Sequence, residues 1–156
     1  MDEQNFMNKA TQLAVDNVTS GLGGPFGALV VKDGQIIGTG QNKVTSSNDP
    51  TAHAEVQAIR EACNHLNSFQ LTGCVIYTSC EPCPMCIGAI YWARPDAVYY
   101  ASTKEDAASI GFDDRFIYEE IALPMNKRSI SIKQVVTNES MNPFKLWASS
   151  VNKIEY

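Results

Sequence analysis

Hydrophobic residues near the N-terminus recur at the spacing of a helix, and the segments after them have the pattern of strands. One face of the predicted helix is formed by Phe6, Ala10, Leu13, Ala14 and Val18. Asp2 is suited to cap its start. Residues 26–32 and 35–41 flank an Asp-Gly dipeptide, which is typical of a tight hairpin turn. The chain is therefore predicted to open with a helix and an antiparallel β-hairpin.

The middle of the chain alternates between helical and strand patterns. Residues 52–65 and 85–93 are predicted to be helices, and the second of these stops at Arg94 and Pro95. Residues 74–79 and 97–101 are apolar runs typical of buried strands. This alternation predicts parallel strand pairs, with helices on both faces of a sheet that the hairpin begins.

Three more elements are predicted after residue 110. Residues 115–121 favour a short helix, residues 130–136 a last strand, and a final helix begins at Asn142. The chain of 156 residues suits one compact domain. The predicted fold class is thus α/β: one domain over residues 1–156, with three α/β/α layers and a central mixed sheet of about five strands.

Composition narrows the range of partners. The net charge of −5 makes a nucleic acid an unexpected partner, because an acidic chain lacks the field that attracts polyanions. No apolar run is long enough to span a bilayer, so no membrane partner is expected. The five cysteines come without a secretory signal and favour reduced thiols in the cytoplasm over a disulfide framework.

The candidate chemistry centres on Cys83 and Cys86, whose two-residue separation at a helix start is a common zinc-binding unit. His53, which also precedes a predicted helix, could supply a third ligand. Three protein ligands leave one position for water, as in catalytic zinc sites. Glu55 is placed to handle the protons of that water. The alternatives are a redox pair of cysteines or a purely structural metal site.

Cys80 extends the cysteine pattern by one more two-residue step. A bacterial iron–sulfur run would require a further cysteine at position 90, where the chain has Ile90. We therefore expect Cys80 to pack beside the metal site without binding the metal.

The His53-Ala54-Glu55 and Pro82-Cys83-x-x-Cys86 elements resemble those of the zinc-dependent cytidine/deoxycytidylate deaminase superfamily. Within it, residues 23–27, 48–55, 78–94 and 111–114 and a C-terminus ending in tyrosine most resemble the bacterial guanine deaminases. The resemblance implies a cytidine deaminase-like fold and the hydrolysis of guanine to xanthine and ammonia, a step of purine catabolism or salvage.

The resemblance also implies roles for individual residues. His53, Cys83 and Cys86 would hold one zinc per subunit, and Glu55 would carry protons between water and the purine. Asp114 would assist proton transfer and hold the substrate edge, although either Asp113 or Asp114 could simply cap the following helix. The implied contacts with the purine base are Phe26, Asn42, Ala54, Trp92 and Tyr156.

A homodimer is the implied assembly, in which a C-terminal segment of about residues 138–156 crosses to a second subunit and Tyr156 closes the partner's site. The apolar face of the last helix, with Phe144 and Trp147, is compatible with this exchange and equally with packing on its own subunit.

Three alternatives stay open. A tRNA adenosine deaminase shares the two motifs but would call for a basic surface. A cytosine or cytidine deaminase would not need the acidic loop at residues 111–114. A non-catalytic, zinc-stabilised binding module would bind the metal and release no ammonia.

Overall fold

The computed structural model describes residues 2–156. The helices are α1 (Glu3–Thr19), α2 (Val44–Ser47), α3 (Ala54–Leu66), α4 (Pro84–Ala93), α5 (Lys104–Ser109), α6 (Arg115–Ala122) and α7 (Asn142–Ser149), with a 3-10 helix at Met125–Lys127. The strands are β1 (Gly27–Lys32), β2 (Gln35–Gln41), β3 (Cys74–Cys80) and β4 (Ala97–Ser102). The short helices α2 and α5 were not expected from the hydrophobic pattern, because neither buries a residue.

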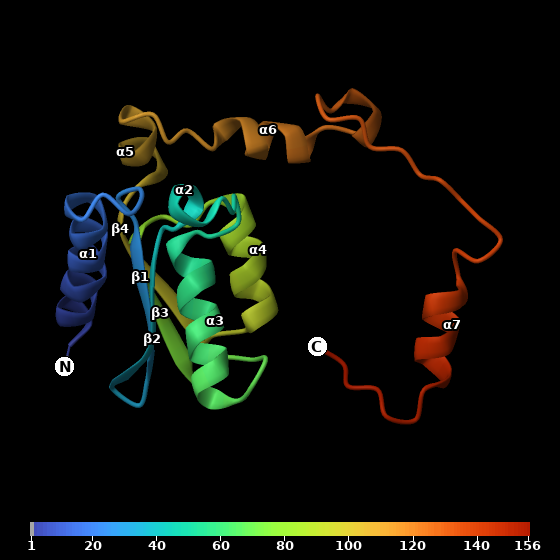
Figure 1. The fold of residues 1–156 in the computed structure, drawn as a ribbon, viewed down its shortest axis with the longest axis horizontal. Coiled ribbons are helices and arrows are strands. Elements are labelled where there is room, and N and C mark those ends of the chain that lie inside the picture. The colour runs from blue at the N-terminus through green and yellow to red at the C-terminus, as the bar shows by residue number, and fades with distance from the viewer. Residues whose placement is uncertain (1) are drawn as a thin grey trace. The chain divides into compact units, whose positions relative to one another are not determined.

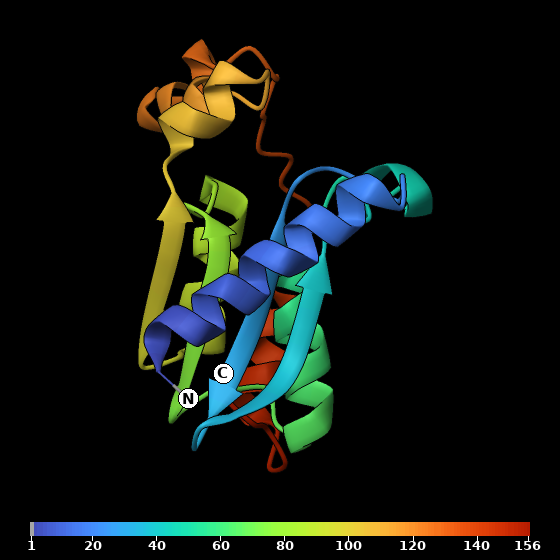
Figure 2. The same ribbon diagram turned by 90° about the vertical axis from the view of Figure 1, so that its left-hand side faces the viewer.

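The four strands form one mixed sheet in the order β2-β1-β3-β4. Strand β1 runs antiparallel to β2 and β3, whereas β3 and β4 are parallel (Figure 2). Helix α1 covers one face of the sheet, and α3 and α4 cover the other (Figure 1). The predicted three-layer α/β class is confirmed, with four strands in place of about five.

Successive residues of a strand point to opposite faces, so β1 and β3 contribute to two separate cores. Val30 and Ile76 pack in the core that includes residues of α3 and α4. Leu29 and Tyr77 pack on the other face with Phe6 of α1, and the Phe6 and Tyr77 ring centroids lie 5.3 Å apart. Strand β3 therefore connects both layers of helices, and the candidate metal site follows directly after it.

Helix α3 lies unusually close to β2 because the facing residues are small. Ala54, Ala58 and Ala62 form a stripe at four-residue spacing, and all three are fully buried. They face Gly38 and Gly40, where an added Cβ would lie only 2.7 Å from the carbonyl oxygen of Ala58 and 2.0 Å from that of Ala54, respectively. Two glycines thus fix the distance of α3, and of its first turn, from the sheet.

Two strand predictions are wrong. Strand β4 is not buried, because it lies at the edge of the sheet and its last four residues are exposed. Residues 130–136 form no strand within the described chain. A segment with strand-like composition becomes a strand only beside a neighbour that pairs with its backbone, and its sequence alone cannot supply that neighbour.

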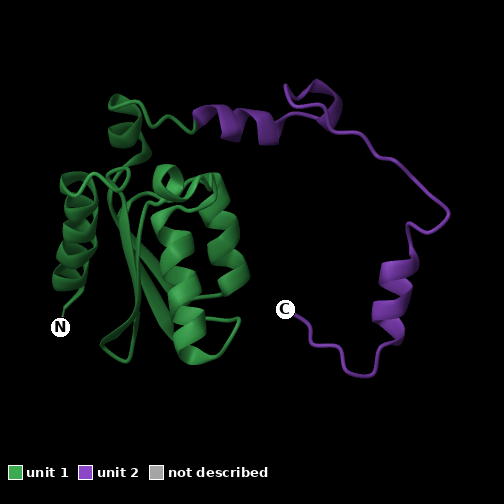
Figure 3. Cartoon of the chain, viewed as in Figure 1, with its two compact units in different colours: residues 1–114 green, residues 115–156 purple. Residues whose placement is uncertain are grey.

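The chain divides into two compact units, residues up to Asp114 and residues 115–156 (Figure 3). The first holds the sheet and both cores. In the second, α6 and α7 are joined by extended segments, and no residue between 115 and 156 is buried. Many of its large apolar side chains are exposed, among them Phe116, Ile130, Val135, Phe144 and Trp147. Among the described helices, none is long and apolar enough to cross a membrane.

Candidate active site

The three predicted metal ligands lie together at the starts of two helices. His53 immediately precedes α3, Cys83 immediately precedes α4, and Cys86 lies in the first turn of α4. The Nδ1 atom of His53 is 3.5 Å from Sγ of Cys83 and 3.4 Å from Sγ of Cys86. The three ligand atoms all lie within 4.8 Å of one another. The loops that lead into α3 and α4 thus bring the three side chains together on one face of the sheet.

The spacing of these atoms fits zinc. A tetrahedral zinc ion with bonds of about 2.3 Å to sulfur and about 2.0 Å to nitrogen would separate the sulfur and nitrogen atoms by about 3.5 Å. The two observed sulfur–nitrogen distances are 3.5 and 3.4 Å. One imidazole and two thiolates are also donors that zinc prefers. Cys80 lies outside this group, since its sulfur donates to the carbonyl oxygen of Thr103 at 3.6 Å.

The pKa values of Cys83 and Cys86 are shifted in opposite directions from that of an ordinary thiol. Hydrogen bonds from Cys86 and His53 lower the pKa of Cys83 to about 4. Its bond to Cys83, together with burial, raises the pKa of Cys86 above that of an ordinary thiol. The hydrogen bond to Cys83 also raises the pKa of His53. A metal ion therefore meets one thiolate and one thiol, and the thiol must lose its proton to become a ligand.

Glu55 lies beside the ligand group and is almost fully buried. Its Oε2 atom accepts a hydrogen bond from the Cys86 sulfur at 3.3 Å, and its Oε1 atom accepts one from Oγ1 of Thr78 at 3.1 Å. Burial raises the pKa of the Glu55 carboxyl. A carboxyl of raised pKa that borders a metal site is suited to accept and return protons near neutral pH. Thr78 was not singled out from the sequence. Strand alternation was the available signal, because Thr78 follows the buried Ile76 by two residues and its side chain therefore points to the same face of β3, toward α3.

Asn42, the predicted purine contact, is held in a defined orientation. Its Oδ1 atom accepts a hydrogen bond from the backbone N–H of Val44 at 3.2 Å, so its amide NH₂ is the group that remains to face a ligand. Its backbone is fixed by Asn17, whose Nδ2 atom donates to the carbonyl oxygens of Asn42 and Gly24 at 2.9 and 2.8 Å. Asn17 is only 1% exposed, and the hydrophobic pattern of α1 gave no signal for this polar role.

The acidic loop packs against Phe26. The rings of Phe26 and Phe112 meet edge to face with centroids 5.0 Å apart, which fixes the loop that ends at Asp114. Partial burial raises the pKa of the Asp114 carboxyl, and the nearby Cys83 thiolate acts in the same direction. The role of Asp114 in the site stays a prediction.

The other predicted substrate contacts differ in their positions. Ala54 is buried at the first position of α3, where a helix leaves its backbone N–H groups without an acceptor of its own. Trp92 lies six residues beyond Cys86 on α4, about 9 Å along the helix, and is 61% exposed. Tyr156 belongs to the C-terminal unit and is exposed. For these three residues, as for Phe26 and Asn42, substrate contact stays a prediction.

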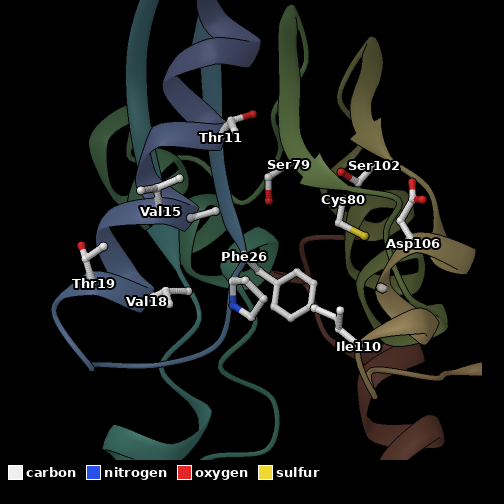
Figure 4. A pocket seen from close by; sticks show the side chains of 13 residues that line it. Thr11, Val15, Val18, Thr19, Phe26, Ser79, Cys80, Ser102, Asp106 and Ile110 are labelled. Carbon is white, nitrogen blue, oxygen red and sulfur yellow. The ribbon is translucent and has the colours of Figure 1, made fainter.

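A cavity of about 420 Å³ lies between α1 and α5 (Figure 4). Its lining includes Phe26, Ser79 and Cys80, together with Val15 of α1 and Ile110. Burial raises the pKa of Cys80 to about 11, so the thiol that faces this cavity stays protonated at neutral pH. The cavity contains none of the three ligand residues.

Comparison with known proteins places this site in a family. Residues 1–102 match the cytidine and deoxycytidylate deaminase zinc-binding region. This chain belongs to the cytidine and deoxycytidylate deaminase family. The match includes His53, Glu55, Cys83 and Cys86, and it confirms the superfamily that the two motifs resemble.

Within this deaminase family, one similarity extends over the whole chain. The chain is 58% identical to guanine deaminase of Bacillus subtilis (strain 168) over 156 residues, which is 100% of both sequences. A crystal structure of guanine deaminase from Bacillus subtilis matches it with a TM-score of 0.98, covering 100% of this chain and 99% of that one. The predicted resemblance to bacterial guanine deaminases is confirmed.

Two further family members are similar over less of their length. A guanine deaminase from Nitrosomonas europaea is 32% identical, with a TM-score of 0.69, over 72% of this chain and 65% of that one. A tRNA-specific adenosine deaminase of Aquifex aeolicus (strain VF5) is 46% identical over 78 residues, 50% of this chain and 52% of the relative.

Proposed function

We propose that this chain is a guanine deaminase, which hydrolyses guanine to xanthine and ammonia in purine catabolism or salvage. The structural observation that best supports this reaction is the position of Glu55, whose Oε2 atom lies 3.3 Å from the Cys86 sulfur. The substrate is supported by similarity over the whole chain to a guanine deaminase, whereas the similarity to a tRNA-specific adenosine deaminase covers half of it.

In this proposal His53, Cys83 and Cys86 hold one zinc ion per subunit. When bound, zinc acidifies a water molecule and so supplies a nucleophile at neutral pH. Glu55 would accept a proton from the water molecule as the water oxygen attacks the amino-bearing ring carbon. Glu55 would pass this proton to the ring nitrogen, then take up the proton of the added hydroxyl and deliver it to the amino group, so that the amine leaves as ammonia and the added oxygen becomes a carbonyl of xanthine.

Two polar groups orient the purine. Asn42 donates through its amide NH₂, because its Oδ1 atom is already engaged by Val44. Asp114 accepts from the edge of guanine that offers a ring N–H beside the amino group, and it assists proton transfer there. Adenine has no such pair of donors at one edge, so Asp114 would select for guanine. Phe26 and Ala54 are proposed to contact the base, together with Trp92 and Tyr156.

The active enzyme is proposed to be a homodimer with exchanged C-terminal segments. This proposal is supported by the exposed large apolar side chains of residues 115–156. It is also supported by β4, whose edge can pair with a further strand, and by residues 130–136, where Ile130 and Ile132 alternate with polar residues. Residues 138–156 of one subunit would close the partner's site with Tyr156.

The cytoplasm is the proposed location, because all five cysteines are free thiols and the ligand pair must stay reduced to bind zinc.

The test is ultraviolet monitoring of purified, zinc-loaded protein with guanine, adenine, cytosine and cytidine in parallel, with ammonia release measured in the same samples. We expect turnover with guanine and far slower reaction with the other three. Faster reaction with cytosine or cytidine would mean that this compound, and not guanine, is the substrate. Zinc binding without ammonia release from any base would indicate a binding module instead.

A further inference from the structure

Strand β3 carries a buried hydroxyl that the mechanism above does not use. Thr78 is 1% exposed, and it points to the same face of the sheet as Ile76, toward α3. Its Oγ1 atom lies 3.1 Å from Oε1 of Glu55. Thr78 thus bonds Oε1 of Glu55, whereas Cys86 bonds Oε2.

The hydroxyl of Thr78 has one hydrogen and two acceptors within reach. Besides Glu55, the carbonyl oxygen of Cys80 lies 3.1 Å from the same Oγ1 atom. A carboxylate is a stronger acceptor than a neutral carbonyl, so the hydrogen goes to Glu55 when that group is ionised.

A carboxylate held by one oxygen has little freedom left at the other. With Oε1 bonded to Thr78, Oε2 is directed to the ligand group, 3.3 Å from the Cys86 sulfur. The free rotation of an unanchored glutamate would instead distribute Oε2 over several orientations, and misplacement of a reacting group by about 1 Å can cost a factor of about 10² in rate.

We infer that Thr78 is a positioning residue, which holds Glu55 with one carboxylate oxygen toward the metal ligands and so sets the rate of proton transfer. This inference rests on the proposed function, because it assigns Thr78 a part in the same deamination. The Thr78 hydroxyl bonds Glu55 and the carbonyl oxygen of Cys80, so Thr78 acts through Glu55.

Two substitutions of Thr78 separate its hydroxyl from its shape. Thr78→Val keeps the volume and removes the donor, whereas Thr78→Ser keeps the donor and removes a methyl group. Ser79→Ala is the matched control, since Ser79 is the adjacent buried hydroxyl on the opposite face of β3. Its Oγ atom accepts a hydrogen bond from the backbone N–H of Gly27 at 3.0 Å, at the start of β1.

The experiment measures kcat and KM for guanine, the ratio of zinc to protein, and the thermal midpoint of all four proteins. Thr78→Val is expected to lower kcat by about 10- to 100-fold with KM and zinc content unchanged. Thr78→Ser is expected to recover kcat to within a factor of about 3. Ser79→Ala is expected to lower the thermal midpoint while keeping kcat.

The inference is overturned if Thr78→Val keeps the wild-type kcat, if Thr78→Ser is as slow as Thr78→Val, or if Thr78→Val loses zinc. The last result would mean that the hydroxyl supports the metal group and not the carboxylate. A wild-type protein without activity on guanine would contradict the proposed function, whereas an active wild type with an equally active Thr78→Val variant would contradict the role of Thr78 alone.

Discussion

Replacing Gly40 by alanine tests whether the close packing of α3 on β2 sets the position of the catalytic residues. The added Cβ would lie 2.0 Å from the carbonyl oxygen of Ala54 and 2.6 Å from the backbone nitrogen of Ala58. Both neighbours are backbone atoms, which cannot rotate away. Ordinary contact begins near 3.4 Å, so the first turn of α3 must move by about 1.4 Å.

That displacement would act directly on the site. His53 and Glu55 move with the first turn of α3, while Cys83 and Cys86 stay with α4. Ligand distances in metal sites tolerate changes of only about 0.2 Å. We therefore expect weaker zinc binding, a loss of about 10²-fold in kcat/KM from misplacement of Glu55, and destabilisation of about 1–3 kcal/mol from overpacking.

The assay combines competition with a zinc chelator, guanine turnover at saturating zinc and denaturant unfolding. Gly88→Ala is the control, because Gly88 lies within α4 and its added Cβ would meet no atom within 4 Å. Removing a glycine from a helix interior should raise stability by roughly 0.5–1 kcal/mol and leave zinc affinity and turnover unchanged. If Gly40→Ala binds zinc and turns over guanine like the wild type, the packing argument is refuted.

Three further predictions concern the metal, the loop that holds Asn42, and the C-terminus. Above the raised pKa of His53, zinc loading should release about one proton, from Cys86. Below that pKa it should release about two, because the protonated imidazole must also give up its proton. Titration calorimetry in buffers of different ionisation enthalpy measures this release, and binding heats that do not depend on the buffer would contradict it. Asn17→Ala removes the donor to one buried and one part-buried carbonyl group, so it should lower the free energy of unfolding by about 2–4 kcal/mol and raise KM for guanine. A change in the free energy of unfolding below about 0.5 kcal/mol would argue against this role of Asn17. Truncation before Lys153 should leave zinc content intact and lower kcat/KM, and unchanged kinetics would exclude closure of the site by Tyr156.

The sequence predicted the elements whose signals are local. Asp2 caps α1 as expected, since its carboxylate accepts from the backbone N–H of Asn5 at 2.9 Å, an interaction within one turn. His53 and Cys83 lie at the starts of their helices as expected, although α3 begins at Ala54 and not at residue 52. In these cases one short stretch of residues contains the whole cause of the local structure.

What could not be predicted depends on contacts between distant segments. Thr78 reaches Glu55 across 23 positions and Asn17 reaches Asn42 across 25, and neither contact leaves a periodic signal. The strand predicted at residues 130–136 does not form, because alternating apolar residues favour a strand but do not specify the neighbouring strand that would pair with it.

The central claim is that Glu55 moves the protons of a zinc-dependent deamination of guanine, and the isosteric substitution Glu55→Gln tests it most directly. Wild-type and variant proteins are loaded with zinc, their metal content is measured, and ammonia release from guanine is followed. We expect equal zinc content and a fall in kcat of about 10³-fold in the variant, because glutamine cannot accept or return a proton. A zinc-loaded Glu55→Gln protein that releases ammonia at the wild-type rate would contradict the account.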